Sequence, residues 1–94
     1  RDTDIDALAT RQSQMLEAVW PSLETGGTLL YVTCSLLPEE NEQQIAGFLS
    51  RHPEAQAPRI DAAWGTAREI GRQTVPTDGG MDGFFYARLE KTRP

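Results

Sequence analysis

Apolar side chains recur at spacings of three and four along the first quarter of the chain, which is the pattern of a helix with one buried face. Pro21 cannot donate a backbone hydrogen bond to the preceding turn, so we expect the helix to end or kink there. Gly26 and Gly27 then provide a stop and a turn. The predicted buried face consists of Ile5, Leu8, Met15, Leu16, Val19, Trp20 and Leu23.

A run of apolar and β-branched residues at 28–33 predicts a strand. Because the run is apolar on both alternations, we expect an inner, parallel strand of a sheet that is covered on both faces. Pro38 suits the first turn of a second helix, which we expect to reach residue 51 before His52 and Pro53 close it. The order of helix, buried strand and helix predicts an α/β fold.

The segment after the second helix has a weaker pattern. Residues 55–60 predict a short strand, which Pro58 confines to an edge of the sheet. Residues 61–72 predict either a loop or a short helix around Trp64. The composition of residues 77–80 is typical of a turn.

The last element is a predicted strand over residues 83–90, apolar on both faces at its start and alternating toward its end. We expect Phe84 and Phe85 to belong to the core. If this strand runs antiparallel to 28–33, its start lies beside the end of the earlier strand. Asp82 then lies at the edge of the sheet where that earlier strand ends, either lining a substrate site or capping a turn.

Length and composition narrow the class of protein. With 94 residues and 38% hydrophobic content, the chain makes at most one small domain. No apolar run is long enough for a membrane-spanning helix, so we expect a soluble protein without a membrane partner. One cysteine excludes a disulfide framework, and one cysteine with one histidine cannot supply the four ligands of a structural zinc site.

The charge is acidic and unevenly distributed. The net charge of −5 argues against a free-standing nucleic-acid-binding protein. Residues 1–47 carry two basic and eight acidic side chains, a net −6, whereas 48–94 carry seven and six, a net +1. Glu39, Glu40 and Glu42 open the second predicted helix, where the helix dipole favours negative charge, so we interpret them as helix stabilisation rather than as a metal site.

Cys34 is the residue most typical of a reactive site. It follows a predicted buried strand, and ligands of open α/β sheets bind at the carboxyl ends of strands. The start of the next helix would favour a thiolate, while the three glutamates there oppose it. Two interpretations stay open: Cys34 is a nucleophile, or it is a small buried core residue of a non-catalytic α/β interaction module.

A third interpretation is a cysteine hydrolase, for which His52 is the one candidate base in the sequence. The second predicted helix rises about 1.5 Å per residue and carries His52 away from Cys34. Its crossover leaves His52 at the opposite edge of the sheet. We therefore expect no Cys–His pair and interpret His52 as a surface histidine near a helix end.

Three motifs in their order resemble the NOL/NOP2/Sun family of RNA cytosine-5 methyltransferases, and in particular its bacterial members that act on small-subunit ribosomal RNA. The resemblance covers nearly the whole chain and is weakest over 55–72. The motifs are Gly26-Gly-Thr-Leu-Leu-Tyr-Val-Thr-Cys-Ser35, then Pro38-Glu-Glu-Asn-Glu42, then Asp82-Gly-Phe-Phe-Tyr-Ala-Arg-Leu89.

The resemblance implies a Rossmann-like fold that uses S-adenosylmethionine, with Cys34 as the nucleophile that attacks C6 of a target cytosine in ribosomal RNA. That covalent step makes C5 nucleophilic enough to accept a methyl group, and the base must first leave its stack. Thr33, Ser35 and Asp82 are the candidate substrate-proximal residues. The resemblance also implies a cytoplasmic protein.

Several family features are missing from the sequence: the glycine-rich cofactor loop, the acidic ribose-binding residue and the Pro-Cys motif that assists product release. We therefore expect residues 1–94 to be the C-terminal portion of a single methyltransferase catalytic domain, without its cofactor-binding half or an N-terminal RNA-binding domain. On this interpretation the isolated chain is inactive. We expect it to expose an unpaired strand edge through which it self-associates.

Overall fold

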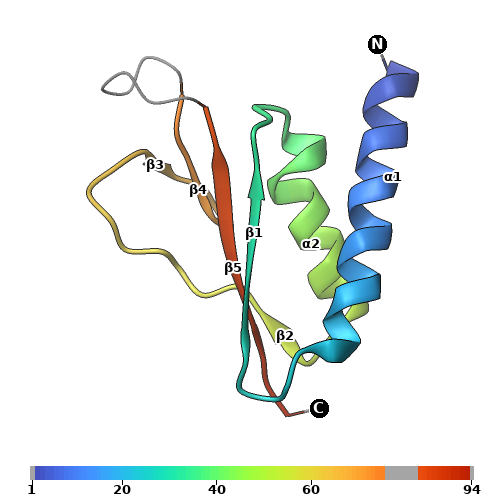
Figure 1. Ribbon diagram of the computed structural model, residues 1–94. Helices are drawn as coiled ribbons and strands as arrows, with labels where there is room; N and C mark the ends of the chain where they lie inside the picture. Colours follow the sequence, from blue (N-terminus) through green and yellow to red (C-terminus); the bar gives the residue numbers. More distant parts are fainter. Residues whose placement is uncertain (1, 76–82, 94) are drawn as a thin grey trace.

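The computed structural model describes residues 2–75 and 83–93, with side chains in the first helix described from Asp6 onward (Figure 1). Among these residues, no helix is long and apolar enough to cross a membrane. The elements in chain order are α1 (Asp2–Val19), η1 (Trp20–Ser22), β1 (Thr28–Thr33), η2 (Pro38–Glu40), α2 (Glu42–Arg51), β2 (Ala55–Gln56), β3 (Thr66–Ala67), β4 (Arg72–Gln73) and β5 (Phe85–Lys91).

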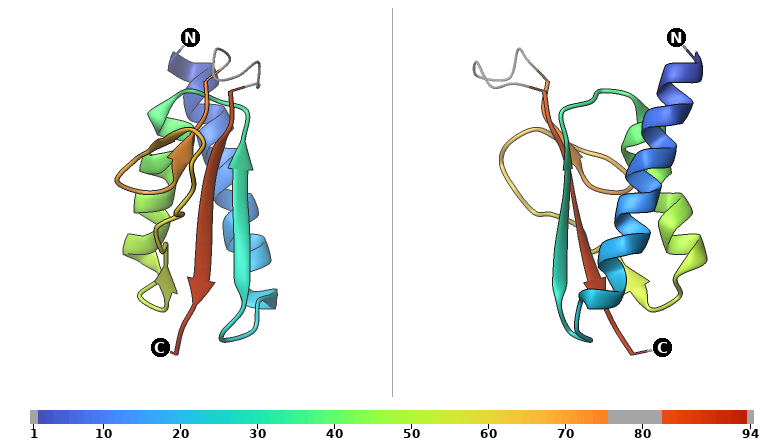
Figure 2. Two further views of the ribbon diagram at one scale, coloured as in Figure 1. Left: turned by 90° about the vertical axis from the view of Figure 1, so that its left-hand side faces the viewer. Right: turned by 45° about the vertical axis from the view of Figure 1, so that its right-hand side comes forward.

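The strand β5 is the centre of the sheet. It pairs with the whole length of β1, and it also pairs with β4 and with β2, in every case antiparallel. The register sets Thr33 opposite Phe85 and Thr28 opposite Glu90, so the start of β5 lies beside the end of β1. The predicted antiparallel pairing of these two strands is thus confirmed. Both helices cover one face of the sheet, and the segment between β2 and β4 loops out on the other side (Figure 2).

The core lies between the helices and alternate residues of β5. Phe85, Ala87 and Leu89 are fully buried and point toward the helices, as the two-residue period of a strand requires. Ile45 and Phe48 of α2 meet them with no exposed surface. The remaining buried apolar residues of this cluster are Leu16, Trp20 and Ala55.

The predicted burial of α1 and β1 is only partly met. Met15 and Val19 on α1 are 65% and 48% exposed, and Leu30 and Val32 on β1 are 58% and 44% exposed. Within the described residues β1 has a strand partner on one side only, at the end of the sheet, and its one ladder is antiparallel. The expected inner strand is therefore an edge strand here, with the open edge that the sequence also predicts.

The later elements differ in detail from those predicted from the sequence. The second helix begins as a 3₁₀ turn and is interrupted at Asn41, whose φ of −115° and ψ of −106° are not helical. The strand predicted over 55–60 is confined to Ala55–Gln56. Residues 61–72 contain no helix; the chain there loops into the β3–β4 pair. The turn predicted at 77–80 lies outside the described residues.

Phe85 belongs to the core as predicted, but Phe84 does not. Phe84 is partly buried, and its ring centroid lies 6.2 Å from that of Tyr86. Tyr86 in turn contacts Trp64 edge to face at 5.1 Å. The backbone carbonyl of Phe84 accepts a hydrogen bond of 2.7 Å from the amide of Thr74, so this residue extends the pairing of the last strands instead of filling the core.

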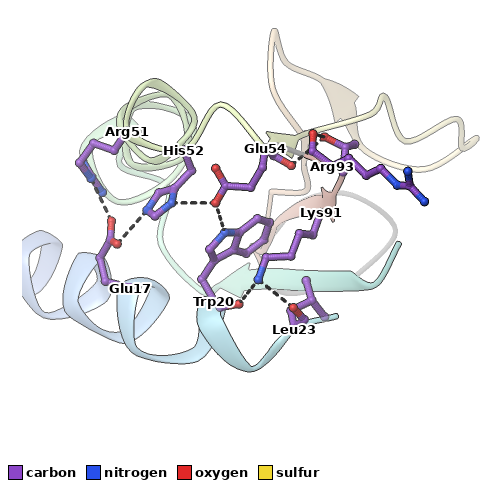
Figure 3. A network of polar contacts seen from close by, with 9 residues as sticks. Glu17, Trp20, Leu23, Arg51, His52, Glu54, Lys91 and Arg93 are labelled. Carbon is purple, nitrogen blue, oxygen red and sulfur yellow. Dashed lines mark hydrogen bonds and ion pairs between the residues drawn. The ribbon is translucent and has the colours of Figure 1, made fainter. Parts of the chain in front are cut away.

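A polar network joins the ends of α1, α2 and β5 (Figure 3). The two ring nitrogens of His52 lie 2.8 Å from Glu17 and 3.2 Å from Glu54. The indole N–H of Trp20 donates to Glu54 at 2.7 Å. The His52 ring also stacks on Phe48 with centroids 4.3 Å apart. His52 lies directly after the end of α2, as predicted, but it is only partly exposed, because its ring packs on Phe48 and its nitrogens contact one carboxylate of α1 and one of the turn after α2.

This network predicts a loss of stability in acid. A hydrogen bond from Arg51, followed by one from His52, holds the pKa of Glu17 below the ordinary glutamate value, and the Trp20 indole is the main cause that lowers the pKa of Glu54. A carboxyl with a lowered pKa stabilises the folded state above the ordinary value of about 4.3, and the contribution is lost as the pH falls through the lowered value.

We expect the free energy of unfolding in urea to fall between pH 6 and pH 3, and to fall less in the double variant E17Q/E54Q. The control E24Q, at an exposed glutamate outside the network, should keep the wild-type pH dependence. An unchanged pH dependence in the double variant would show that these contacts do not stabilise the fold.

Candidate active site

Cys34 lies where the sequence predicts it, directly after the last residue of β1. Its side chain is exposed and forms no disulfide. A short loop connects it to Pro38, where η2 and then α2 carry the chain back along the sheet (Figure 1). The carboxyl end of β1 therefore presents a free thiol to solvent. This exposure contradicts the alternative in which Cys34 is a buried structural residue.

Hydrogen bonds on both sides of Cys34 fix the surrounding loop. On one side, Thr33 pairs with Phe85 in the β1–β5 ladder. On the other side, the backbone amide of Ser35 donates to the Thr33 hydroxyl at 3.3 Å, and the Ser35 carbonyl accepts from the side-chain amide of Asn41 at 2.8 Å. The Thr33 hydroxyl in turn donates to Oδ1 of Asn41. The Ser35 hydroxyl accepts from the amide of Leu37 at 2.9 Å, which closes the turn.

An apolar groove of about 540 Å³ runs along β1 and α1 and ends at Cys34. Its apolar lining consists of Met15, Leu16 and Val19 of α1 and of the β1 edge from Leu29 to Val32. Its polar residues at the Cys34 end include Gln12 and Glu40, and Nε2 of Gln12 donates to Glu40 at 3.2 Å.

Tyr31 lines the same groove and orders its polar end. The phenol donates to the backbone carbonyl of Glu40 at 2.7 Å. Burial, with a smaller effect of the Glu40 charge, raises the pKa of Tyr31 above its ordinary value, so the phenol stays protonated and remains a donor. This contact ties the 3₁₀ turn that precedes α2 to the strand that ends at Cys34.

The structure brings some predicted site residues together and separates others. Thr33 and Ser35 flank Cys34 and share one hydrogen-bond network. Asp82 lies outside the described residues, although the register of β5 brings the strand that follows it to the Cys34 end of the sheet. His52 lies after the far end of α2, with both ring nitrogens on glutamates. A hydrolase pair with Cys34 is therefore unsupported.

Two residues that contact this loop, Asn41 and Gln73, were not among the site residues predicted from the sequence. Asn41 is 2% exposed and Gln73 is 4% exposed, and the two side-chain amides are hydrogen-bonded to each other at 3.1 Å. Asn41 lies inside the Pro-Glu-Glu-Asn-Glu motif, and its place in that motif was the available signal. Gln73 comes from β4, a two-residue strand with no pattern of its own.

Comparison with known proteins identifies the family. Residues 1–90 match the family model described as 16S rRNA methyltransferase RsmB/F. Ribosomal RNA small subunit methyltransferase B of Yersinia pseudotuberculosis is 54% identical over 91 residues, which cover 97% of this chain and 20% of that protein. The chain therefore spans about a fifth of the length of this curated relative.

Solved structures share the fold. The crystal structure of PH0851 superposes with a TM-score of 0.89 at 34% identity, covering 97% of this chain and 21% of that chain. NSun6 from Pyrococcus horikoshii superposes with a TM-score of 0.80 at 27% identity, covering 95% of this chain and 23% of the other. The α/β arrangement is thus part of the Rossmann-like fold of Sun-type methyltransferases, and the resemblance noted from the three motifs is confirmed. This chain belongs to the RsmB/F family of 16S ribosomal RNA methyltransferases.

Proposed function

We propose that this chain is the C-terminal portion of the catalytic domain of an RNA cytosine-5 methyltransferase, and that Cys34 is its nucleophile. The observation that carries the proposal is an exposed thiol at the carboxyl end of β1, held between two hydrogen-bonded residues, in a chain that matches a ribosomal RNA methyltransferase family over residues 1–90. The substrate is a cytosine of small-subunit ribosomal RNA, and the protein acts in the cytoplasm.

The chemistry assigned to Cys34 is a reversible addition to the base. Its thiolate forms a bond from Sγ to C6, and the electron pair of the C5–C6 double bond moves to C5, which becomes nucleophilic. When bound, S-adenosylmethionine would supply the methyl group that C5 accepts and would leave as S-adenosylhomocysteine. Transfer of the C5 proton to a base or to water then returns an electron pair to the ring, the Sγ–C6 bond breaks, and the thiolate is restored. The exposure of Cys34 suits this role, because a flipped base must reach the sulfur.

The described residues do not themselves fit S-adenosylmethionine. Its ribose and amino-acid groups need several polar partners, whereas the groove at Cys34 has apolar walls and its Gln12 and Glu40 already bind each other. We place the cofactor-binding residues and the RNA-binding domain in the part of the protein that the relatives contain beyond this segment. Among the described residues β1 pairs with β5 on one side only, and this open edge supports a further strand from that part.

The product of the reaction tests this proposal. The full-length protein, incubated with unmodified small-subunit ribosomal RNA and S-adenosylmethionine, should produce 5-methylcytidine, identified by mass spectrometry of the digested nucleosides. The isolated 94-residue chain in the same assay should transfer no methyl group. A product methylated on another atom or another base would contradict the proposed chemistry, and activity of the isolated chain would contradict the placement of the cofactor site.

A further inference from the structure

The two backbone polar groups of Ser35, the residue after Cys34, are both bound by side chains. The amide donates to the Thr33 hydroxyl, the hydroxyl donates to Asn41 Oδ1, and Asn41 Nδ2 donates back to the Ser35 carbonyl. These contacts form a closed ring that begins and ends at Ser35, directly next to Cys34. Hydrogen bonds that share partners in a buried site fix one another's orientation.

Gln73 of β4, which is separated from β1 by β5, is hydrogen-bonded to this ring through Asn41. Its Oε1 accepts from Asn41 Nδ2 at 3.1 Å, and its Nε2 donates to the carbonyl of Thr74 at 2.9 Å, with a longer contact of 3.5 Å to the Ser35 carbonyl. Because Nε2 of Gln73 donates to backbone, its Oε1 is the atom that faces Asn41. Asn41 must then present its N–H groups to both Gln73 and Ser35 and its oxygen to Thr33. One orientation of each amide satisfies every contact.

We propose that Asn41 and Gln73 are positioning residues for Cys34. The strand ladder fixes Thr33 on one side of the cysteine, and the two amides fix Ser35 on the other, so the direction of the Cys34 side chain is set by contacts made on its two neighbours. This inference rests on the proposed function of Cys34. A misplacement of a reacting atom by about 1 Å can lower a rate by about 10²-fold, and this defines the effect expected when the ring is broken.

The test compares two equivalent substitutions in the full-length protein. N41D keeps the shape and the acceptor oxygen of the side chain but removes both donated hydrogen bonds. Q44E makes the same amide-to-carboxylate change at Gln44, which is 8% exposed and donates at 2.7 Å to the carbonyl of Ala9, away from Cys34. We expect kcat to fall by about 10²-fold in N41D, with the KM for RNA within about threefold, and kcat of Q44E to stay within about threefold of wild type.

A second pair of variants keeps the proposal testable if N41D folds poorly. T33V retains the β-branched shape suited to the strand and removes the hydroxyl that links Ser35 to Asn41. We expect a fall in kcat of about tenfold or more, and T33S, which restores a hydroxyl, should recover most of it. Because both single substitutions break the same hydrogen-bonded ring, the fall in kcat of the double variant N41D/T33V should be smaller than the product of the two single falls in kcat.

The outcomes separate this inference from the proposed function. If Cys34→Ala is inactive while N41D and T33V keep wild-type kcat, the positioning role is overturned and the nucleophile stands. The positioning role is also overturned if N41D and Q44E lose kcat equally, or if T33S does not differ from T33V. If Cys34→Ala retains wild-type methyl transfer, the proposed function itself fails.

Discussion

Replacing Cys34 by alanine should abolish methyl transfer by the full-length protein. Without the thiolate, no bond forms at C6, and C5 of cytosine lacks the electron density to attack a methyl group. We expect kcat to fall by at least about 10⁴-fold, the scale on which loss of a catalytic nucleophile acts. The dissociation constant for RNA should change by less than about threefold, because Cys34 is a small exposed side chain and the rest of the loop is unaltered.

The matched variant is C34S, which keeps the size and polarity of the side chain. A serine hydroxyl is a weak nucleophile unless a base activates it, and His52 is engaged with glutamates after the far end of α2. We therefore expect C34S to be as inactive as C34A. Methyl transfer by C34A within tenfold of the wild-type rate would exclude Cys34 as the nucleophile.

The largest expected effect on stability follows from truncating Phe85. Its side chain has no exposed surface and lies in the central strand, with Tyr31 edge to face at 6.4 Å. Replacing a fully buried phenylalanine by alanine costs about 3–5 kcal/mol through lost burial and the remaining cavity. Domains of this size are stable by only about 5–15 kcal/mol in total. We expect F85A to lower the free energy of unfolding, measured in urea, by about 3–5 kcal/mol, or to prevent folding.

The neighbouring residue is the matched control. Phe84 is the same residue type one position earlier, but it is only partly buried and lies outside the core cluster. F84A should cost about 1 kcal/mol, in keeping with partial burial. An equal loss of unfolding free energy in F84A and F85A would contradict the finding that Phe85 is a core residue and Phe84 is not.

The elements with strong periodicity could be predicted from the sequence. The three-and-four spacing located α1, and the run of β-branched residues gave the bounds of β1 as the structure has them. The start of the second helix was predicted at Pro38, but the interruption at Asn41 was not, because it depends on the side-chain contacts of Asn41 with Ser35 and Gln73. The place of Cys34 at the carboxyl end of a strand could be predicted, because it required only that β1 end at Thr33.

The β3–β4 pair could not be predicted, since each strand has two residues and its stability comes from contacts distant in sequence. Gly71 precedes β4 with a φ of +77°, and a side chain there would collide with the Phe85 ring and the Tyr86 carbonyl. Arg72 is 8% exposed, and its guanidinium donates to the carbonyls of Trp64, Ile60 and Gly65. A charged residue satisfied by backbone carbonyls has no signature in the local pattern.

The apolar pattern of β1 predicted more burial than the described chain supplies. Leu30 and Val32 point to the face that the helices do not cover, and they are exposed. A strand that is apolar on both faces is typical of a sheet covered on both sides. Here only the described residues bury β1, and they cover one of its faces. Self-association of the isolated chain through the open edge of β1 stays a prediction.

The most direct test of the central claim is to locate the covalent bond. The full-length protein is incubated with S-adenosylmethionine and substrate RNA in which 5-fluorocytosine replaces cytosine, then denatured and digested. Fluorine at C5 takes the place of the proton whose loss would release the enzyme, so the bond to C6 persists. Mass spectrometry should find the nucleotide on the peptide that contains Cys34. A nucleotide bound to a different residue, or methyl transfer to this RNA without any adduct, would contradict the account.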